Sequence, residues 1–438
     1  MKMNIPQEIC VYFFSLSALG VLYTMNNVPA FQHPQVIPVV GVVVMLAVFL
    51  VVYLAVRHRP PKDPLFYVFV EFSFTCVISL VIALEQDRFT SGFMEFYQKT
   101  GEPYVVTAYA IMMSYWDGVV HFLLYLFMVQ RMANEMSYRS MGLFWAGSLL
   151  ANMAVYVPGI IIGKYGAYIC PTYWLNFPFL FGALWGAISL FNRPRELPII
   201  PADQVAAEQK RGLLSRPLDL LLVLFLVGAM GFTIFRGFVV LDCPLDSCFT
   251  YIYQYEPYLK DPVGFPRFMM LLYLFYGLPL LALFVYGLWK PGCTWMLDWS
   301  LFFAGAIAQS QWCHTGASVH HRTPFTYRLP EGRWWAIVGV NLLYAAGPQL
   351  LALRCALRPA FFLKTVPADR ADAPEEDQLT AGAANPASSA PSPSPPRPLH
   401  HRYCGNHRSG RRPRTGRHAA GCDRLRTKTE ENSAGESV

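Results

Sequence analysis

The segment from Val36 to Val56 constrains the fold of this chain more than any other feature. It carries no charged side chain, and only Pro38, Gly41 and Tyr53 interrupt its hydrophobic residues. A bilayer core about 30 Å thick needs roughly 20 such residues in a helix. The whole chain is 54% hydrophobic and 14% charged, which is about half the charge of a typical soluble protein. The sequence therefore predicts an integral membrane protein.

Further apolar segments of similar length predict an all-α polytopic membrane protein with about ten transmembrane helices. The predicted spans are 9–25, 36–56, 64–84, 104–130, 141–163, 173–191, 217–240, 266–289, 299–319 and 333–353. Basic residues such as Arg57, Arg59 and Lys62 concentrate in alternate loops, and acidic residues concentrate in the loops between them. Because Lys and Arg favour the cytosolic side, the pattern places both termini in the cytosol and the acidic loops in a lumen.

Residues 359–438 are predicted to form a disordered cytosolic tail. From about Thr365 the chain is rich in Pro, Ser, Ala and Arg, which bury too little apolar surface to offset the loss of conformational entropy on folding. The tail is strongly basic, so the net charge of +7 says little about the membrane part. The sequence has no nucleic-acid-binding motif, and a basic arm of this kind is suited to anionic lipid.

The chain contains an internal repeat. Glu102-Pro103-Tyr104 recurs 154 residues later as Glu256-Pro257-Tyr258, and Asp63 is matched 156 residues later by Asp219. Two further pairs recur at similar spacing, namely Trp145 with Trp299 and Pro171 with Pro324. Each copy consists of one predicted span, an acidic loop that ends in Glu-Pro-Tyr, and three more spans. An even number of spans gives both copies the same orientation, so the pattern indicates a parallel duplication.

Asp117 and His121 form a polar pair within a predicted span. Residues four apart share one face of a helix, and ionisable groups at this depth usually face the interior of a bundle. The pair could hold a sterol hydroxyl or an amine, or it could be a hydrogen-bonded link between helices. Trp116 is adjacent to the pair, and Glu85 lies where an earlier span meets the predicted lumen. We treat these four residues as candidate lipid-binding residues.

Cysteine and histidine spacing predicts neither a metal site nor a cofactor. The sequence has no Cys-x-x-Cys pair and no Cys/His cluster with zinc spacing. Cys243 and Cys248 share one polar loop and are the candidate disulfide. Arg236, near the predicted luminal end of its span, is expected to pair with Asp242 or to reach the lipid headgroups.

Several short stretches of the chain match the motifs of one family of membrane proteins. They include Pro60–Tyr67, Gly92–Tyr97, Gly101–Tyr104, Tyr115–Gly118, Gly163–Gly166, Tyr251–Tyr258 and Gly316–Ser318. Over roughly residues 10–363 the chain resembles the transmembrane 6 superfamily. Its members carry two EXPERA modules, the four-helix module also found in emopamil-binding-type sterol isomerases and the sigma-2 receptor. The resemblance implies two leading helices (1–60), a first module (61–192), a cytosolic linker (193–216), a second module (217–358) and the tail (359–438).

The related isomerases indicate which residues of this chain belong to a sterol site. In those enzymes an acidic residue near the position of Glu85 works with a second carboxylate in the next span, which Asp117 resembles. An enzymatic site in this chain would therefore use Glu85, Asp117 and His121.

The second copy departs from the isomerase pattern. The place matching Glu85 holds Arg236, and the next span offers Tyr273 but no acid. This copy keeps Asn341 and Tyr344, which resemble the Asn and the aromatic residue of the isomerases' last span, so we add both to the candidate lipid-binding residues. Neither copy has the complete set, which argues against an intact isomerase.

The resemblance implies a part in the lipid loading of secreted lipoproteins and in limiting lipid-droplet content. We interpret the chain as a protein that binds lipid or sterol, and whether it is an enzyme stays open. Lipoprotein-assembly or lipid-synthesis proteins are the implied partners. Thr323–Arg328 and the Tyr-rich loop 251–258 favour the branch of the family found in the endoplasmic reticulum and the ER–Golgi intermediate compartment. The other branch, which would imply lysosomal membranes, shares Lys62-Asp63-Pro64 and stays open. A sterol isomerase-like enzyme and a membrane scaffold are the alternative functions.

Overall fold

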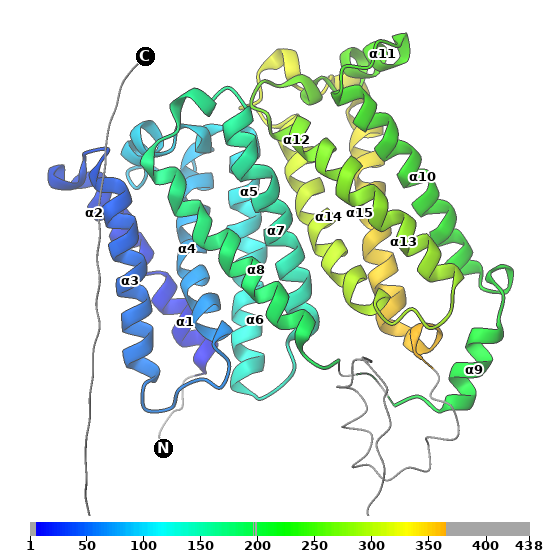
Figure 1. Ribbon diagram of the computed structural model, residues 1–438. Coiled ribbons are helices and arrows are strands. Elements are labelled where there is room, and N and C mark those ends of the chain that lie inside the picture. The colour runs from blue at the N-terminus through cyan, green and yellow to red at the C-terminus, as the bar shows by residue number, and fades with distance from the viewer. Residues whose placement is uncertain (1–5, 196, 198, 365–438) are drawn as a thin grey trace, which may run out of the picture. The chain divides into compact units, whose positions relative to one another are not determined.

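The computed structural model describes residues 6–364 except 196 and 198, and this part of the chain is all-α as predicted. The predicted tail from residue 365 onward lies outside the described residues. The α-helices are α1 (Gln7–Ser15), α2 (Ala18–Asn27), α3 (Val36–Val56), α4 (Leu65–Gln86), α5 (Ala108–Tyr115), α6 (Phe122–Ala133), α7 (Arg139–Ile162), α8 (Phe177–Asn192), α9 (Ala202–Lys210), α10 (Pro217–Val240), α11 (Asp246–Gln254), α12 (Phe265–Leu272), α13 (Leu278–Trp289), α14 (Met296–Val319) and α15 (Trp334–Leu357) (Figure 1).

Nine helical segments in the described part of the chain are long and apolar enough to cross a membrane. They confirm the polytopic architecture and correspond to nine of the ten predicted spans. The predicted span 299–319 is α14, which has 24 residues but is less apolar. Its polar residues Gln309, Ser310, Gln311 and His314 are all buried. Because α14 packs between α7 and α15, these polar side chains meet protein and not lipid.

Two groups of helices follow the leading helices, and they share the features of the repeat. The first contains α4 to α8 and the second contains α10 to α15 (Figure 1). In each group the predicted second span is interrupted by a π-helical segment at the corresponding place, Trp116–His121 between α5 and α6, and Tyr273–Gly277 between α12 and α13. π-Helical bulges widen a helix locally and are common at functional sites.

Helices α7 and α14 form the largest part of the contact between these two groups, which we call the first and second modules (Figure 1). A Cβ atom added to Gly147 would lie 1.9 Å from the carbonyl oxygen of Phe302, and one added to Gly305 would lie 1.9 Å from that of Phe144. This reciprocal contact requires glycine at both positions, as small residues allow helix backbones to approach closely. Near the N-terminal ends of the two helices, Arg139 pairs with Asp298 at 2.5 Å, so α7 and α14 run in the same direction.

Each module begins with an aspartate that pairs with an arginine from the end of its last helix. Asp63 lies 2.6 Å from Arg193, directly after α8, and Asp219 lies 2.6 Å from Arg354 in the last turn of α15. Asp63 also accepts a hydrogen bond from the backbone N–H of Leu65, as expected for a helix cap. An equivalent Asp–Arg ion pair therefore joins the start of the first helix to the end of the last helix in both modules.

The first residues of the segment predicted as tail belong to the folded part of the protein. Pro359–Phe362 form a 3-10 turn in which Phe361 and Phe362 are buried. The guanidinium of Arg216 stacks 3.7 Å from the ring centre of Phe361, and Gln209 of α9 donates to its carbonyl oxygen at 3.3 Å. The predicted start of the disordered tail at residue 359 is thus too early, because Phe361 and Phe362 are packed within the folded part of the chain.

Candidate functional site

An apolar cavity lies between the leading helices and the first module. Helices α2, α3, α4, α5, α7 and α8 contribute to its wall, together with the segment that precedes α5. It encloses about 1200 Å³ of space between atoms, part of which is continuous with the outside. Its apolar lining includes Met45, Phe74, Ile78, Ile82, Phe93 and Phe179. A few polar residues share the wall, and this combination is typical of sites for small apolar ligands.

Glu102 is the acidic residue in the wall of this cavity, and its side chain is held by three donors. The hydroxyl of Tyr97 donates to Oε2 at 2.7 Å, and the hydroxyl of Tyr104 donates to Oε1 at 2.7 Å. Asn176, which directly precedes α8, donates to Oε1 at 3.0 Å. Burial raises the pKa of Glu102, although these three hydrogen bonds act in the opposite direction.

Glu256 occupies the corresponding position in the second module but has a cationic partner. Tyr251 donates to its Oε2 at 2.7 Å and Asn341 of α15 donates to its Oε1 at 3.1 Å. Arg236 of α10 donates through Nε to Oε2 at 2.9 Å and through Nη2 to Oε1. Burial alone would raise the pKa of Glu256, but Arg236 and the neighbouring His314 hold it well below its usual range.

The predicted pair Asp117 and His121 belongs to a complete hydrogen-bond network. Asp117 Oδ1 lies 2.7 Å from His121 Nδ1, and Asp117 Oδ2 accepts from Ser79 at 2.9 Å. Ser148 accepts from Trp116 Nε1 at 2.9 Å and lies 2.8 Å from His121 Nε2. A proton on Nδ1 satisfies all these groups, because the Ser148 hydroxyl can then donate to Nε2. Of the five residues only Ser79 lines the cavity, so the pair lies one hydrogen bond behind its wall.

Glu85 holds the loop that follows α4. Its carboxylate accepts hydrogen bonds from the backbone N–H groups of Gly92 at 3.1 Å and Met94 at 2.8 Å. Both carboxylate oxygens are thereby used to fix the loop, and Glu85 is not among the residues that line the cavity. The contacts of Glu85 in the described structure are therefore those of a structural residue.

Asn341 and Tyr344 lie in the second module, apart from the other predicted residues. Asn341 belongs to the Glu256 cluster, whereas the Tyr344 hydroxyl lies 2.8 Å from that of Thr233. The ring of Tyr344 stacks on that of Tyr273, with centroids 5.7 Å apart. The six predicted lipid-binding residues therefore divide between two modules and do not form one site.

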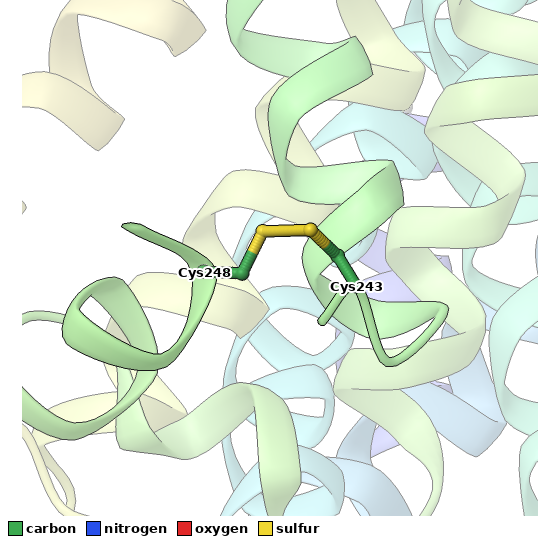
Figure 2. The surroundings of a disulfide bond; sticks show 2 residues. All are labelled: Cys243 and Cys248. Atoms are coloured by element: carbon green, nitrogen blue, oxygen red, sulfur yellow. A yellow bond between two sulfur atoms is a disulfide. The ribbon is translucent and has the colours of Figure 1, made fainter. Parts of the chain in front are cut away.

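The loop that follows α10, which the sequence predicts to be luminal, contains the candidate disulfide. Cys243 and Cys248 are bonded to each other, which ties the start of α11 to the end of α10 (Figure 2). Asp242 pairs with Lys260 and, at 3.2 Å, with Arg267. The expected pairing of Arg236 with Asp242 is therefore wrong. Arg236 points into the bundle, where Glu256 offers a buried carboxylate.

Asp87, His320 and His321 bring potential metal-binding atoms within 4.8 Å of one another. His320 Nε2 lies 3.1 Å from Asp87 Oδ1, and His320 Nδ1 accepts a hydrogen bond from the backbone N–H of Arg322 at 3.1 Å. An imidazole whose Nδ1 accepts a hydrogen bond carries its proton on Nε2, which faces Asp87. Because a metal ion would have to displace that proton, the arrangement favours a His–Asp contact over a metal site.

Sequence reasoning missed the two buried glutamates as site residues. Glu102 and Glu256 were visible as the first residue of the repeated Glu-Pro-Tyr, and the repeat served only as evidence of duplication. A glutamate that recurs at the same place in both copies, beside apolar spans and tyrosines, is a signal for a buried carboxylate. Their partners Asn176, Arg236 and Asn341 are distant in sequence and could not be assigned without the fold.

Two family models match the chain. Residues 17–201 match the model described as "Transmembrane 6 superfamily member 2-like, transmembrane domain", and residues 249–355 match "EXPERA (EXPanded EBP superfamily)". "Transmembrane 6 superfamily member 2" from Homo sapiens is 49% identical over 355 residues, which cover 81% of this chain and 94% of the relative. The chain belongs to the transmembrane 6 superfamily.

Two further relatives agree with this membership of the transmembrane 6 superfamily. The proteins of the same name from Rattus norvegicus and Mus musculus are each 50% identical over 353 and 349 residues, covering 93% and 92% of the relative. The relatives thereby confirm the preference for one branch of the family, which was based on Thr323–Arg328 and the loop 251–258 and is the branch of member 2. No solved structure matches the chain significantly.

Proposed function

We propose that the protein binds a lipid or sterol in the cavity of its first module and regulates lipid metabolism from the membrane. In this proposal it acts in the endoplasmic reticulum and the ER–Golgi intermediate compartment, promotes lipid loading of secreted lipoproteins and limits the content of lipid droplets. Membership of the transmembrane 6 superfamily and the EXPERA match support a lipid-handling role. The observation that carries the proposal is a cavity with apolar walls and a buried polar cluster in one part of its lining.

The composition of the wall fits an amphiphile. An acyl chain or sterol body that contacts Phe74, Ile78 and Phe179 would move from water or bulk lipid to a packed apolar surface. Each buried methylene of such a ligand contributes about 0.8 kcal/mol relative to water. The hydroxyl of Tyr97, the carboxylate of Glu102 and the amide of Asn176 would meet the polar end of the same molecule. A wholly apolar ligand would form no hydrogen bond with these groups.

Filling the cavity tests the proposal. Ile78 lies on α4 and lines the cavity, so Ile78→Trp introduces an indole into the space that the ligand would occupy. Ile188→Trp is the matched control, because Ile188 lies on α8 of the same module and 53% of its surface is exposed. Native mass spectrometry and lipid extraction of the purified proteins should find a bound lipid in wild type and Ile188→Trp, and much less of it in Ile78→Trp.

A cellular measurement tests the physiological part of the proposal. Cells that carry Ile78→Trp in place of wild type should secrete less lipid with lipoproteins and accumulate lipid droplets, while Ile188→Trp cells behave as wild type. Equal expression and equal location of the three proteins are the required controls. Unchanged lipid secretion by a variant that has lost its bound lipid would separate cavity binding from the cellular role and contradict the proposal.

A further inference from the structure

Each module contains a buried glutamate with a similar set of hydrogen-bond donors, but only the second glutamate is also paired with an arginine. In both, a tyrosine five residues before the glutamate donates to Oε2 at 2.7 Å, and an asparagine associated with the last helix donates to Oε1. The residues are Tyr97, Glu102 and Asn176 in the first module and Tyr251, Glu256 and Asn341 in the second. The second cluster adds a guanidinium, and the first cluster faces a cavity.

The residue that makes this difference is at the fourth position before the end of each module's first helix. In α10 this residue is Arg236, and in α4 it is Ile82. The offset of 154 residues is the one that relates Glu102 to Glu256, so the match of Arg236 with Glu85 made from the sequence is wrong. Ile82 lines the cavity together with Glu102, so the side chain that corresponds to Arg236 is on the wall of the same space. In the second module the Arg236 guanidinium occupies the position beside Glu256. In the first module the corresponding residue, Ile82, forms part of the apolar cavity wall.

The acceptor capacity of the two glutamates differs in the same way. Oε2 of Glu256 accepts two hydrogen bonds from near partners, one from Tyr251 and one from Arg236 Nε. Among the described residues, Oε2 of Glu102 accepts one, from Tyr97. A carboxylate oxygen has room for two donors, so Oε2 of Glu102 can accept one more. Ile82 and Phe93, which line the same cavity, have no side-chain donor to offer.

We propose that Glu102 accepts the headgroup of the bound lipid, at the position that Arg236 takes against Glu256 in the second module. The ligand is then an amphiphile with a hydrogen-bond donor, a hydroxyl or a protonated amine, on an apolar body. This inference rests on the proposed function, since it requires that the cavity binds a lipid. It also assigns one such site to each chain, because Arg236 closes the corresponding position in the second module.

The experiment uses two probes with a donor headgroup and one without. Cholesterol carries a hydroxyl, sphingosine carries a protonated amine and hydroxyls, and cholesteryl methyl ether has lost the donor of cholesterol. Binding of each probe to the purified full-length protein in nanodiscs is measured for wild type and for Glu102→Gln and Ile82→Arg. Ile82→Met is the control for Ile82→Arg, because it keeps the wall apolar. Glu256→Gln is the control for Glu102→Gln in the other module.

The expected result is saturation at one probe molecule per chain and weaker binding in two variants. Loss of a hydrogen bond to a charged group corresponds to about a tenfold or greater loss of affinity, so Glu102→Gln should weaken whichever donor probe fits by that factor. Ile82→Arg should abolish binding, whereas Ile82→Met should bind as wild type. Glu256→Gln, measured well below its own lowered Tm, should also bind as wild type. A preference for cholesterol or for sphingosine identifies the hydroxyl or the amine as the headgroup.

The outcomes separate this inference from the proposed function. If wild type binds none of the three probes and copurifies with no lipid, the proposed function itself is contradicted. If wild type binds cholesterol and its methyl ether equally and Glu102→Gln has no effect, the cavity binds lipid but the assignment of Glu102 is overturned. Two probe molecules per chain in wild type, with one lost in Glu256→Gln, would overturn the assignment of a single site.

Discussion

Replacing Arg236 by methionine should destabilise the second module strongly. The side chains of Arg236 and Glu256 are 2% and 1% exposed, and the guanidinium donates to both carboxylate oxygens. Methionine keeps an unbranched side chain of similar reach but leaves Glu256 without its cation. Removing one partner of a buried ion pair typically costs about 3–5 kcal/mol, because the remaining charge is neither paired nor hydrated.

This magnitude can be measured as a change of the unfolding temperature. For domains of 150–250 residues, 1 kcal/mol corresponds to roughly 2–4 °C, so Arg236→Met should lower the Tm by about 6–20 °C. The assay is thermal unfolding of the purified protein in detergent at pH 7. Arg267→Met is the matched control, because Arg267 is 51% exposed and its partner Asp242 is 55% exposed. An exposed pair contributes about 1 kcal/mol or less, so this Tm should change by a few degrees at most.

A double substitution tests whether the uncompensated charge causes the loss. Glu256→Gln in the background of Arg236→Met removes the buried charge while it keeps an oxygen for Tyr251 and Asn341 to donate to. The double variant should therefore be more stable than Arg236→Met alone. If Arg236→Met lowers the Tm no more than Arg267→Met, or if the double variant is the least stable of the three, the account of a buried, essential ion pair is refuted.

Three further changes test other parts of the structure. Gly147→Ala should lower stability by about 1–3 kcal/mol because its Cβ would overlap the Phe302 carbonyl, whereas Gly228→Ala, with open space around the Cβ, should be neutral or slightly stabilising in thermal unfolding. The pKa of Glu256 is held below its usual range, so its stabilising contribution is present above about pH 4.5 and is lost as the pH falls below that value. The Tm of wild type should therefore fall more steeply between pH 6 and pH 3 than that of Glu256→Gln, and parallel curves would contradict this. Cys243→Ser should lower stability by about 2 kcal/mol for so short a loop, and a reducing agent should have the same effect on wild type but none on the variant.

The sequence predicted the membrane fold well because its strongest signals are local. The apolar run of α3 agrees with the predicted span 36–56 at both ends, and spans 217–240 and 266–289 agree with α10 and the α12–α13 segment within a residue or two. The repeat of Asp63 and Asp219 also corresponds to a shared ion pair at the basic end of each module. Hydrophobicity over 20 residues depends on composition alone, so no knowledge of tertiary contacts was needed.

The site was harder to predict because a polar residue in a span can serve two purposes. Asp117 and His121 were selected for their depth and spacing, but the structure pairs them with Ser79 and Ser148 behind the cavity wall. Glu85 was selected by resemblance, and it instead fixes a loop. Only the positions of distant helices show that Glu102 lines the cavity and that Arg236 takes the corresponding place in the second module.

The cavity's content is the most direct test of this account, and it can be seen in an electron cryo-microscopy structure of the protein purified in native lipid. We expect elongated density in the cavity of the first module, with its polar end within hydrogen-bonding distance of Glu102 Oε2. The corresponding place beside Glu256 should contain only the Arg236 side chain. A first-module cavity that is closed by side chains, or a lipid bound beside Glu256 and not beside Glu102, would contradict the account.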